Sequence, residues 1–283
     1  MHDLVRDMAL HVTSGTPRFL VKAGMRLTKP LNVREWNKDL EKVSLMENWG
    51  LKVPYPLEMS PPMCPRLSTL LLTGCGIESI PEGFFVHMQG LKILDLSKNP
   101  IKGLPNSIAN LKNLTALLLT NCRYLENVPS LSNLLVLKKL DLQGTNIKSV
   151  PHGMKNLLSL KYLNLSWIDN LIVIPNGMLL RRLMVLELRG LPELKSICSV
   201  DAVVVCDSLK RLEVVDCLKL KRMPLKLPQL DNVQAHSPLS LVMRPKEWRE
   251  SVEWDHPNVK SRLEPLMYPY LKNHYSSTME RHL

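Results

Sequence analysis

The sequence lacks long apolar runs and has few aromatic residues. No charge-free apolar stretch approaches the roughly 18 residues of a membrane-spanning helix, and the N-terminus has neither the basic stretch nor the apolar core of a signal peptide. We therefore expect a cytoplasmic protein without a membrane span. Phe, Trp and Tyr make up only 5% of the 283 residues, but hydrophobic residues make up 45%. That content is enough for a buried core, which excludes wholesale disorder.

Motifs for redox, metal or catalytic chemistry are also missing. The six cysteines form no Cys-x-x-Cys pair, and no Cys/His cluster has zinc spacing, so we expect reduced thiols and no metal site. Gly-x-Ser-x-Gly, His-Glu-x-x-His and kinase motifs do not occur, and the eight histidines are dispersed. We expect no catalytic residue and no enzyme activity.

Acidic residues are fewer than basic ones. The chain has 26 Asp and Glu against 37 Lys and Arg, which gives a formal net charge of +11. A basic protein often binds nucleic acid when its charge is concentrated in one region. Here the excess is scattered along the chain with no run of five like charges, so a nucleic-acid partner is not favoured.

Leucine is abundant and regularly spaced. It occupies 55 positions, and 39 of these lie in the 161 residues from Leu67 to Leu227. The pattern L-x-x-L-x-L recurs there in seven copies, 23 to 26 residues apart, and a degenerate copy flanks the array on each side, at Leu40 and Leu230. The copies begin at Leu67, Leu91, Leu114, Leu137, Leu160, Leu183 and Leu209. A period of about 20–29 residues is typical of leucine-rich repeats.

The sequence therefore predicts an α/β repeat fold, a leucine-rich repeat solenoid (horseshoe) with a parallel β-sheet on its concave side. Alternation along each strand buries the fourth and sixth positions of a copy and turns the third and fifth outward. We expect strands at 69–73, 93–97, 116–120, 139–143, 162–166, 185–189 and 211–215. The ninth position, which includes Cys75, Cys122 and Cys217, is expected to stabilise the turn. The copy at Leu183 carries a three-residue extension near 203–206, where we expect a bulge or loop.

The outward strand positions are candidate protein-binding residues on the concave face. The first three copies offer small and apolar side chains, and neighbouring apolar side chains on a surface tend to mark interaction sites. The later copies offer charges of both signs. Three cations and four acids give the face a net charge of −1, which does not favour binding to the phosphates of a nucleic acid. We therefore expect protein partners and neither nucleic acid nor a small-molecule ligand. The candidates are Leu71, Ile93, Asp95, Ala116, Leu118, Lys139, Asp141, Tyr162, Glu187, Arg189, Arg211 and Glu213.

The two ends differ from the repeats, which suggests three regions: 1–39, 40–235 and 236–283. Apolar residues at helical spacing predict a short amphipathic helix over 3–12, and residues 19–24 resemble a short strand that ends in a turn. Residues 245–254, with proline at the first turn, predict a helix. We expect the C-terminal region to cap the last repeat, since repeat arrays need terminal caps.

Several segments resemble plant intracellular disease-resistance receptors of the coiled-coil NB-ARC leucine-rich repeat class. Met1-His2-Asp3 and the residues after it are similar to the MHD motif that closes the nucleotide-binding region of this family. Segments 19–24 and 43–48 resemble the linker and first repeat, and 247–258 resembles the C-terminal cap of one branch. Under this resemblance, residues 1–39 are the remnant of the NB-ARC region and linker.

The resemblance implies a regulatory role for the MHD-like residues Met1, His2 and Asp3. In the family, His2 would contact the diphosphate of bound ADP and Asp3 would order the local backbone. The chain has no G-x-x-x-x-G-K-[ST] phosphate loop, so we expect a C-terminal piece of such a receptor with no cofactor of its own. ADP or ATP is implied only for the nucleotide-binding domain of the family.

The resemblance also implies a function. It predicts the recognition and autoinhibitory module of a plant immune receptor, which binds a pathogen effector, a guarded host protein or its own nucleotide-binding domain in defence. The alternative is a free-standing intracellular leucine-rich repeat adaptor that scaffolds signalling proteins without a nucleotide switch. A secreted receptor ectodomain is disfavoured by the missing signal peptide and by repeats without Gly-x-Ile-Pro.

Overall fold

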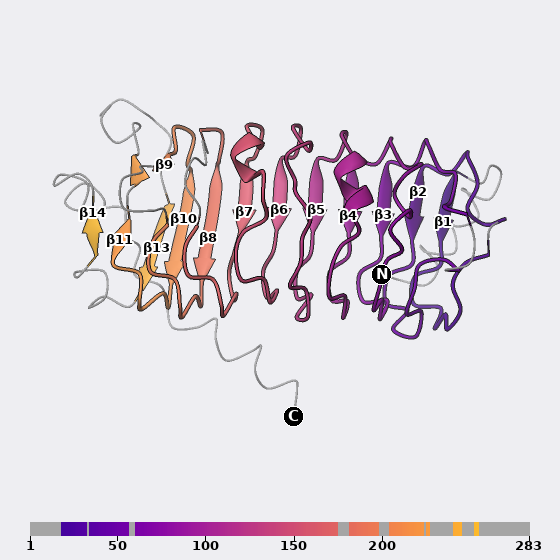
Figure 1. Cartoon of the computed structure of the whole chain (residues 1–283), viewed down its shortest axis with the longest axis horizontal. Helices are drawn as coiled ribbons and strands as arrows, with labels where there is room; N and C mark the ends of the chain where they lie inside the picture. The colour runs from indigo at the N-terminus through magenta and orange to yellow at the C-terminus, as the bar shows by residue number, and fades with distance from the viewer. Residues whose placement is uncertain are drawn as a thin grey trace.

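The protein forms one long row of short parallel strands (Figure 1). The computed structural model describes residues 18–32, 34–56, 60–174, 181–197, 204–223, 225–226, 240–244 and 252–254. Ten strands of the described chain form the main sheet, and each pairs in parallel with its neighbours. They are β1 (Phe19–Val21), β2 (Lys42–Ser44), β3 (Thr69–Leu71), β4 (Ile93–Asp95), β5 (Ala116–Leu118), β6 (Lys139–Asp141), β7 (Tyr162–Asn164), β8 (Val185–Arg189), β10 (Arg211–Val215) and β13 (Ser240–Arg244). The predicted leucine-rich repeat solenoid is confirmed.

The register of the sheet follows the repeat. Leu94 pairs with Leu70 on one side and with Leu117 on the other, and the same frame position stays aligned through Leu212. The leucines at the fourth and sixth positions are almost fully buried, Leu94 and Leu142 with no exposed surface. Full burial of one such side chain contributes about 1.5–3 kcal/mol. Each repeat thus adds one apolar layer that only its neighbours can cover.

All seven predicted strands begin where the frame places them, but five are three residues long instead of five. The hydrogen bonding nevertheless continues beyond them: the Leu72 N–H donates to the Asp95 carbonyl at 2.8 Å and the Gly74 N–H to the Ser97 carbonyl at 2.9 Å. At the eighth position the chain turns through a left-handed residue in each copy. From Gly74 to Asp216, φ at this position lies between 54° and 64°.

At the ninth position a polar or cysteine side chain bonds the turn from inside the core in most repeats, and Ile168 and Leu191 pack there instead, as the sequence predicts. The Asn99 amide donates to the Leu72 and Leu96 carbonyls at 2.7 Å and accepts the Cys75 and Ile77 N–H groups. Where cysteine replaces asparagine, its thiol donates to a carbonyl of the preceding repeat, as Cys122 does to Leu96 at 3.1 Å. Burial raises the pKa of the Cys122 thiol to about 12, so this cysteine is a neutral structural donor.

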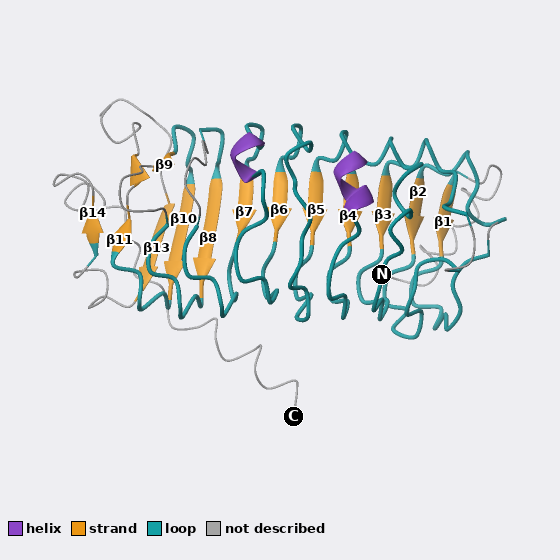
Figure 2. Cartoon of the chain, viewed as in Figure 1, coloured by secondary structure: helices purple, strands orange, loops and turns teal. Residues whose placement is uncertain are grey.

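Helix is scarce in the described chain. Two short 3-10 helices lie in the return segments between strands, η1 (Asn106–Asn110) between β4 and β5 and η2 (Met154–Asn156) between β6 and β7, and loops make up the rest of these two segments (Figure 2). Pro105 precedes η1, consistent with proline ending strand pairing on the return path. None of the helices within the described ranges has the length and apolar character needed to cross a membrane.

The sheet runs beyond the predicted repeat region at both ends. The strand predicted near 19–24 is confirmed as β1, which pairs with β2, and the early repeat at Leu40 is confirmed by β2. At the other end β13 pairs with β10. The predicted helix over 3–12 and the late copy at Leu230 lie outside the described residues, so those two predictions stay open.

Two local predictions near the C-terminus are wrong where the structure describes the residues concerned. Within the helix predicted over 245–254, Glu253–Trp254 form strand β14, which pairs with β11 (Arg222–Met223). In the extension expected to bulge, Val204–Val205 form β9, which pairs with β12 (Leu225–Lys226). In both places a partner strand from another part of the chain outweighs the local pattern, a tertiary effect that spacing along one segment does not contain.

Candidate protein-binding surface

The concave-face candidates lie on parallel rows across the sheet, because the strands stay in register. We define the first row as the third repeat position and the second row as the fifth. The first row runs through Thr69, Ile93, Ala116, Lys139, Tyr162, Val185 and Arg211. The second row runs through Leu71, Asp95, Leu118, Asp141, Asn164, Glu187 and Glu213. Arg189 lies two residues beyond Glu187 on β8.

The N-terminal half of these rows is apolar. Ile93 is 37% exposed, and Leu71, Ala116 and Leu118 are half-buried on neighbouring strands. On β4 the acidic Asp95 lies beside Leu71 and Leu118 in the second row. The four apolar side chains, which we call the apolar strip, therefore lie on the neighbouring strands β3, β4 and β5, with Asp95 between Leu71 and Leu118 in the second row.

The middle of the rows is a polar network centred on Tyr162. The Lys139 ammonium lies 4.6 Å from the centroid of the Tyr162 ring, a cation–π contact. The Tyr162 hydroxyl donates to Glu187 Oε2 at 3.1 Å and accepts from Asn164 Nδ2 at 3.3 Å. Burial raises the pKa of Tyr162, with the nearby carboxylates of Asp141 and Glu187 adding to the shift. The phenol is thus a neutral donor that holds Glu187 in place.

The C-terminal part of the face carries two arginines on one buried carboxylate. Glu213 is 2% exposed, and it accepts hydrogen bonds from Nε of Arg189 and of Arg211, each at 2.6 Å. Both arginines also form ion pairs with it. The hydrogen bond to Glu213 raises the pKa of Arg211. Because the carboxylate is shared, the trio has a net charge of +1, and its two guanidinium groups are partly exposed.

The expectation that Asp141 faces solvent is wrong. Asp141 is only 8% exposed, and its Oδ1 accepts the Gln143 N–H at 3.1 Å. Burial raises the pKa of its carboxyl group. Asp95 and Asn164 use the same second-row position in the same way, accepting the N–H two residues further on. Glu213 is also buried. A partner on this face would therefore contact the side chains around Asp141 and Glu213 and not these two carboxylates themselves.

Comparisons with known proteins agree with this geometry. Residues 65–123 match the family model described as Leucine rich repeat. The chain is 35% identical over 152 residues to disease resistance protein UNI of Arabidopsis thaliana, covering 52% of this chain and 16% of that protein. It is 32% identical over 232 residues to an Arabidopsis protein provisionally named disease resistance protein At4g10780, covering 79% of this chain and 23% of that protein.

The chain is a leucine-rich repeat protein related to plant disease resistance proteins. The resemblance predicted from the sequence is thereby confirmed, although the chain spans less than a quarter of the length of these relatives. A solved structure, the leucine-rich repeat protein LIC12759 of Leptospira interrogans, aligns with a TM-score of 0.56 at 22% identity. That alignment covers 87% of this chain and 68% of the other and supports the fold alone.

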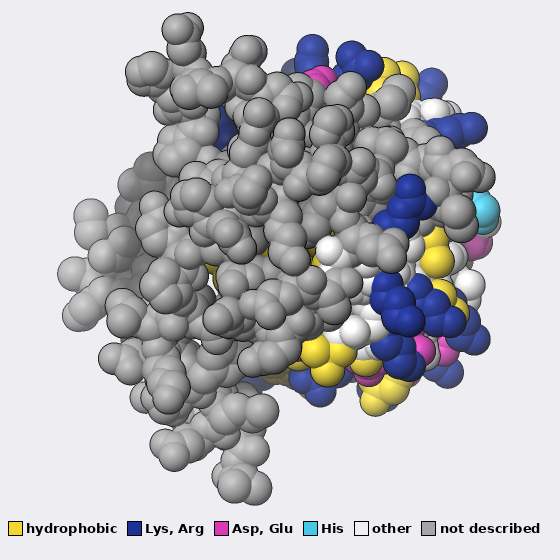
Figure 3. Space-filling model, turned by 90° about the vertical axis from the view of Figure 1, so that its left-hand side faces the viewer, with side chains coloured by type: hydrophobic (Ala, Val, Ile, Leu, Met, Phe, Trp, Pro, Cys, Tyr) yellow, Lys and Arg dark blue, Asp and Glu magenta, His cyan; other side chains and the backbone are white. Residues whose placement is uncertain are grey.

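The remaining sequence predictions for this leucine-rich repeat protein concern the MHD-like residues and a metal site. Met1, His2 and Asp3 lie outside the described residues, so their regulatory role stays a prediction. In the described ranges no three His, Cys, Asp or Glu side chains come close enough to hold a metal ion. Seen from the end that carries β14, Lys and Arg side chains are the most frequent charged groups among the described residues in view (Figure 3).

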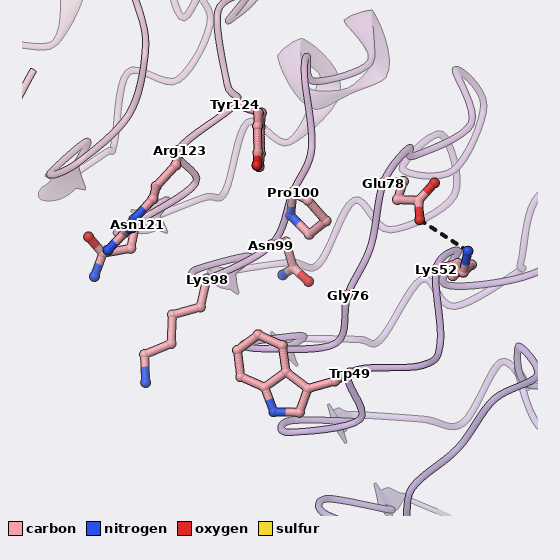
Figure 4. Close-up of a pocket in the computed structure, with 10 residues that line it drawn as sticks. All are labelled: Trp49, Lys52, Gly76, Glu78, Lys98, Asn99, Pro100, Asn121, Arg123 and Tyr124. Atoms are coloured by element: carbon pink, nitrogen blue, oxygen red, sulfur yellow. Dashed lines mark ion pairs between the residues drawn. The ribbon is translucent and has the colours of Figure 1, made fainter. Parts of the chain in front are cut away.

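A second candidate surface lies outside the residues predicted from the sequence. The loops that follow β2, β3, β4 and β5 enclose a depression of about 370 Å³, with Trp49 and Tyr124 on its walls (Figure 4). Both rings are well exposed, at 58% and 60%. The sequence does not indicate this surface, because it does not show which aromatic side chains are exposed; Trp167 is also exposed, at 44%, but lies outside the depression.

Proposed function

We propose that this chain is the recognition module of a plant immune receptor and that its concave face binds a protein partner. The observation that carries the proposal is the graded character of the two rows: an apolar strip on β3 to β5 changes to an ordered polar network on β6 to β10. Contiguous apolar surface favours a docking partner, and fixed charges give orientation and specificity. The relationship to disease resistance proteins supports a role in defence.

The proposal has finer parts. The partner is a pathogen effector, a guarded host protein or the nucleotide-binding domain of the same receptor, and in the last case the contact is autoinhibitory. Any ADP or ATP binds that domain, the chain performs no catalytic step, and the receptor works in the cytoplasm. Pre-ordered side chains support binding, since the Tyr162 and Glu213 networks need little reorganisation when a partner arrives.

A surface-variant experiment tests the proposal. The concave variant combines Leu71→Gln, Ile93→Lys and Leu118→Gln. The control variant combines Leu135→Gln, Val136→Lys and Leu158→Gln, whose parent side chains are 57%, 40% and 57% exposed outside the strands. Affinity capture from leaf extract with quantitative mass spectrometry compares both with the wild type, after circular dichroism confirms folding.

We expect partners that the wild type and the control variant retain and the concave variant loses. Loss of a fragment carrying the receptor's nucleotide-binding domain would identify the autoinhibitory contact, and loss of a host signalling protein alone would favour the adaptor alternative. If the concave variant kept every wild-type partner, the apolar strip would not be the binding surface.

A further inference from the structure

The depression beside the strands is built by four successive repeats. The loops at 49–52, 76–78, 98–100 and 121–124 line it. Figure 4 shows Trp49 and Tyr124 at opposite ends, with Pro100 and Asn99 between the two rings. It shares no residue with the concave-face candidates, so an inference about it does not rest on the proposed function.

The Trp49 ring is held in place although it is exposed. Its Nε1 donates to Glu47 Oε2 at 3.1 Å. The next repeat offers two left-handed glycines beneath it: a Cβ at Gly74 would lie 3.0 Å from the indole, and one at Gly76 would lie 1.9 Å from the Trp49 carbonyl oxygen. The loop thus carries a large apolar ring in a fixed position facing solvent, where a partner's side chain can stack on it.

The floor of the depression is rigid as well. The Asn99 amide is used inside the core, where it accepts the Cys75 and Ile77 N–H groups. Pro100 follows it directly and is half-buried. A half-buried proline ring between two exposed aromatic rings gives a preformed apolar seat, which lowers the entropic cost of binding.

Unpaired cations surround this seat. Lys98 and Arg123 line the depression and form no ion pair with a described residue. Lys52 pairs with Glu78 at 3.3 Å, but both side chains are largely exposed, so the pair is weak. Three cations against one carboxylate give the lining a net charge of +2.

We propose that this depression binds an acidic peptide segment of a partner protein, with an aromatic side chain seated between Trp49 and Tyr124. Carboxylates flanking that aromatic residue would pair with Lys98 and Arg123. The two cations stand on separate loops, which suits separate carboxylates along an extended chain. A phosphate group favours several donors converging on one point, and among the described lining residues no such cradle is present.

The indole N–H resonance of Trp49 gives a local readout. The ¹⁵N-labelled chain is titrated with the capped pentapeptide EEYEE and with its basic counterpart KKYKK, and Trp49→Phe assigns the resonance. We expect EEYEE to shift the Trp49 signal saturably and KKYKK to leave it unchanged. The double variant Lys98→Glu and Arg123→Glu should weaken EEYEE binding at least tenfold.

A charge-matched control separates local recognition from overall charge. Lys148→Glu with Lys155→Glu reverses two exposed cations outside the depression and should leave EEYEE binding unchanged. The proposal is overturned if EEYEE does not shift Trp49, if KKYKK shifts it equally, or if the control weakens binding as much as the Lys98 and Arg123 variant. Tighter binding of a uridine oligonucleotide through the same two residues would replace the peptide by a nucleic acid.

Discussion

At the residue scale, the fifth repeat position, which forms the second row, can either face a partner or bond the turn that follows the strand. The alternation along a strand predicted that the second row points out of the core, and it does. Alternation does not predict, however, how far the side chains of the neighbouring strands cover each residue of that row. Asp141 stands between Leu118 and Asn164 on adjacent strands and is almost covered. Its carboxylate became part of the turn by accepting the Gln143 N–H. Burial of an outward position is therefore a property of three strands, which the sequence of one strand cannot specify.

Asp141 makes a pH prediction. Burial raises the pKa of its carboxyl group in the folded state above the unfolded value of about 3.9. The folded state keeps the proton longer, so this group lowers the free energy of unfolding as the pH rises from the unfolded pKa through the folded one. Asp141→Asn keeps an oxygen acceptor and removes the titration, so we expect the free energy of unfolding of the Asn variant to rise relative to that of the wild type as the pH increases from 3 to 7. Asp141→Ala leaves the Gln143 N–H without this acceptor and should cost about 1–3 kcal/mol.

Urea unfolding of the wild type and both variants at pH 3, 5 and 7 measures these effects. Equal stability of the Asn and Ala variants at pH 7 would show that the hydrogen bond to Gln143 contributes nothing. A wild-type curve that keeps rising from pH 3 to 7 relative to the Asn variant would show that the folded-state pKa is lowered instead.

At the element scale, the turn after each strand depends on the residue at the eighth position of the repeat, whose backbone is left-handed. Strand starts were predictable from the leucine frame because burial and register share its period. Strand ends were not, because the left-handed residue is glycine at Gly74, Gly144 and Gly190 but lysine, asparagine, tryptophan or aspartate elsewhere. The short strands β9 and β14 were likewise unpredictable, since their partners β12 and β11 come from other repeats.

Gly190 tests the turn directly. Its φ is +55°, and an added Cβ would lie 2.2 Å from the Trp167 ring, so Gly190→Ala combines backbone strain with a clash. We expect a loss of at least about 1–2 kcal/mol. Gly103→Ala is the matched control, because its backbone is not left-handed and the nearest atoms lie 3.6 Å away. That change should leave stability equal or slightly higher.

Thermal and urea denaturation compare the two glycine variants. Adding Trp167→Ala to Gly190→Ala should recover only the part of the loss that comes from the clash. Full recovery would mean that the left-handed backbone costs nothing here, and a loss in Gly103→Ala as large as in Gly190→Ala would contradict the assignment of the turn.

At the scale of the whole molecule, the fold is a one-dimensional stack. Each described main-sheet strand contacts its neighbours in the row, and the apolar layers run without interruption from Val43 to Met243. This architecture could be predicted almost entirely from the sequence, because the spacing of the leucine pattern gives the length of each repeat and the position of its strand. It does not contain the Trp49 and Tyr124 depression, since that surface exists only when loops from four successive repeats are brought together.

The stack predicts how the molecule unfolds when one layer fails. Leu163 has no exposed surface and lies on β7 between Leu140 and Leu186, so Leu163→Asp places a charge in the core of one repeat. Stability in such arrays is a sum of repeat and nearest-neighbour terms, so a broken layer should uncouple the two sides. Fewer described main-sheet strands follow β7 than precede it. We expect β8 and β10 to lose amide protection from hydrogen exchange at lower urea than β3 to β5.

Leu158→Asp is the control, at an exposed site in the return segment before β7. It should keep one unfolding transition for the whole sheet. Uniform loss of protection along the Leu163→Asp chain would mean that coupling extends beyond nearest neighbours.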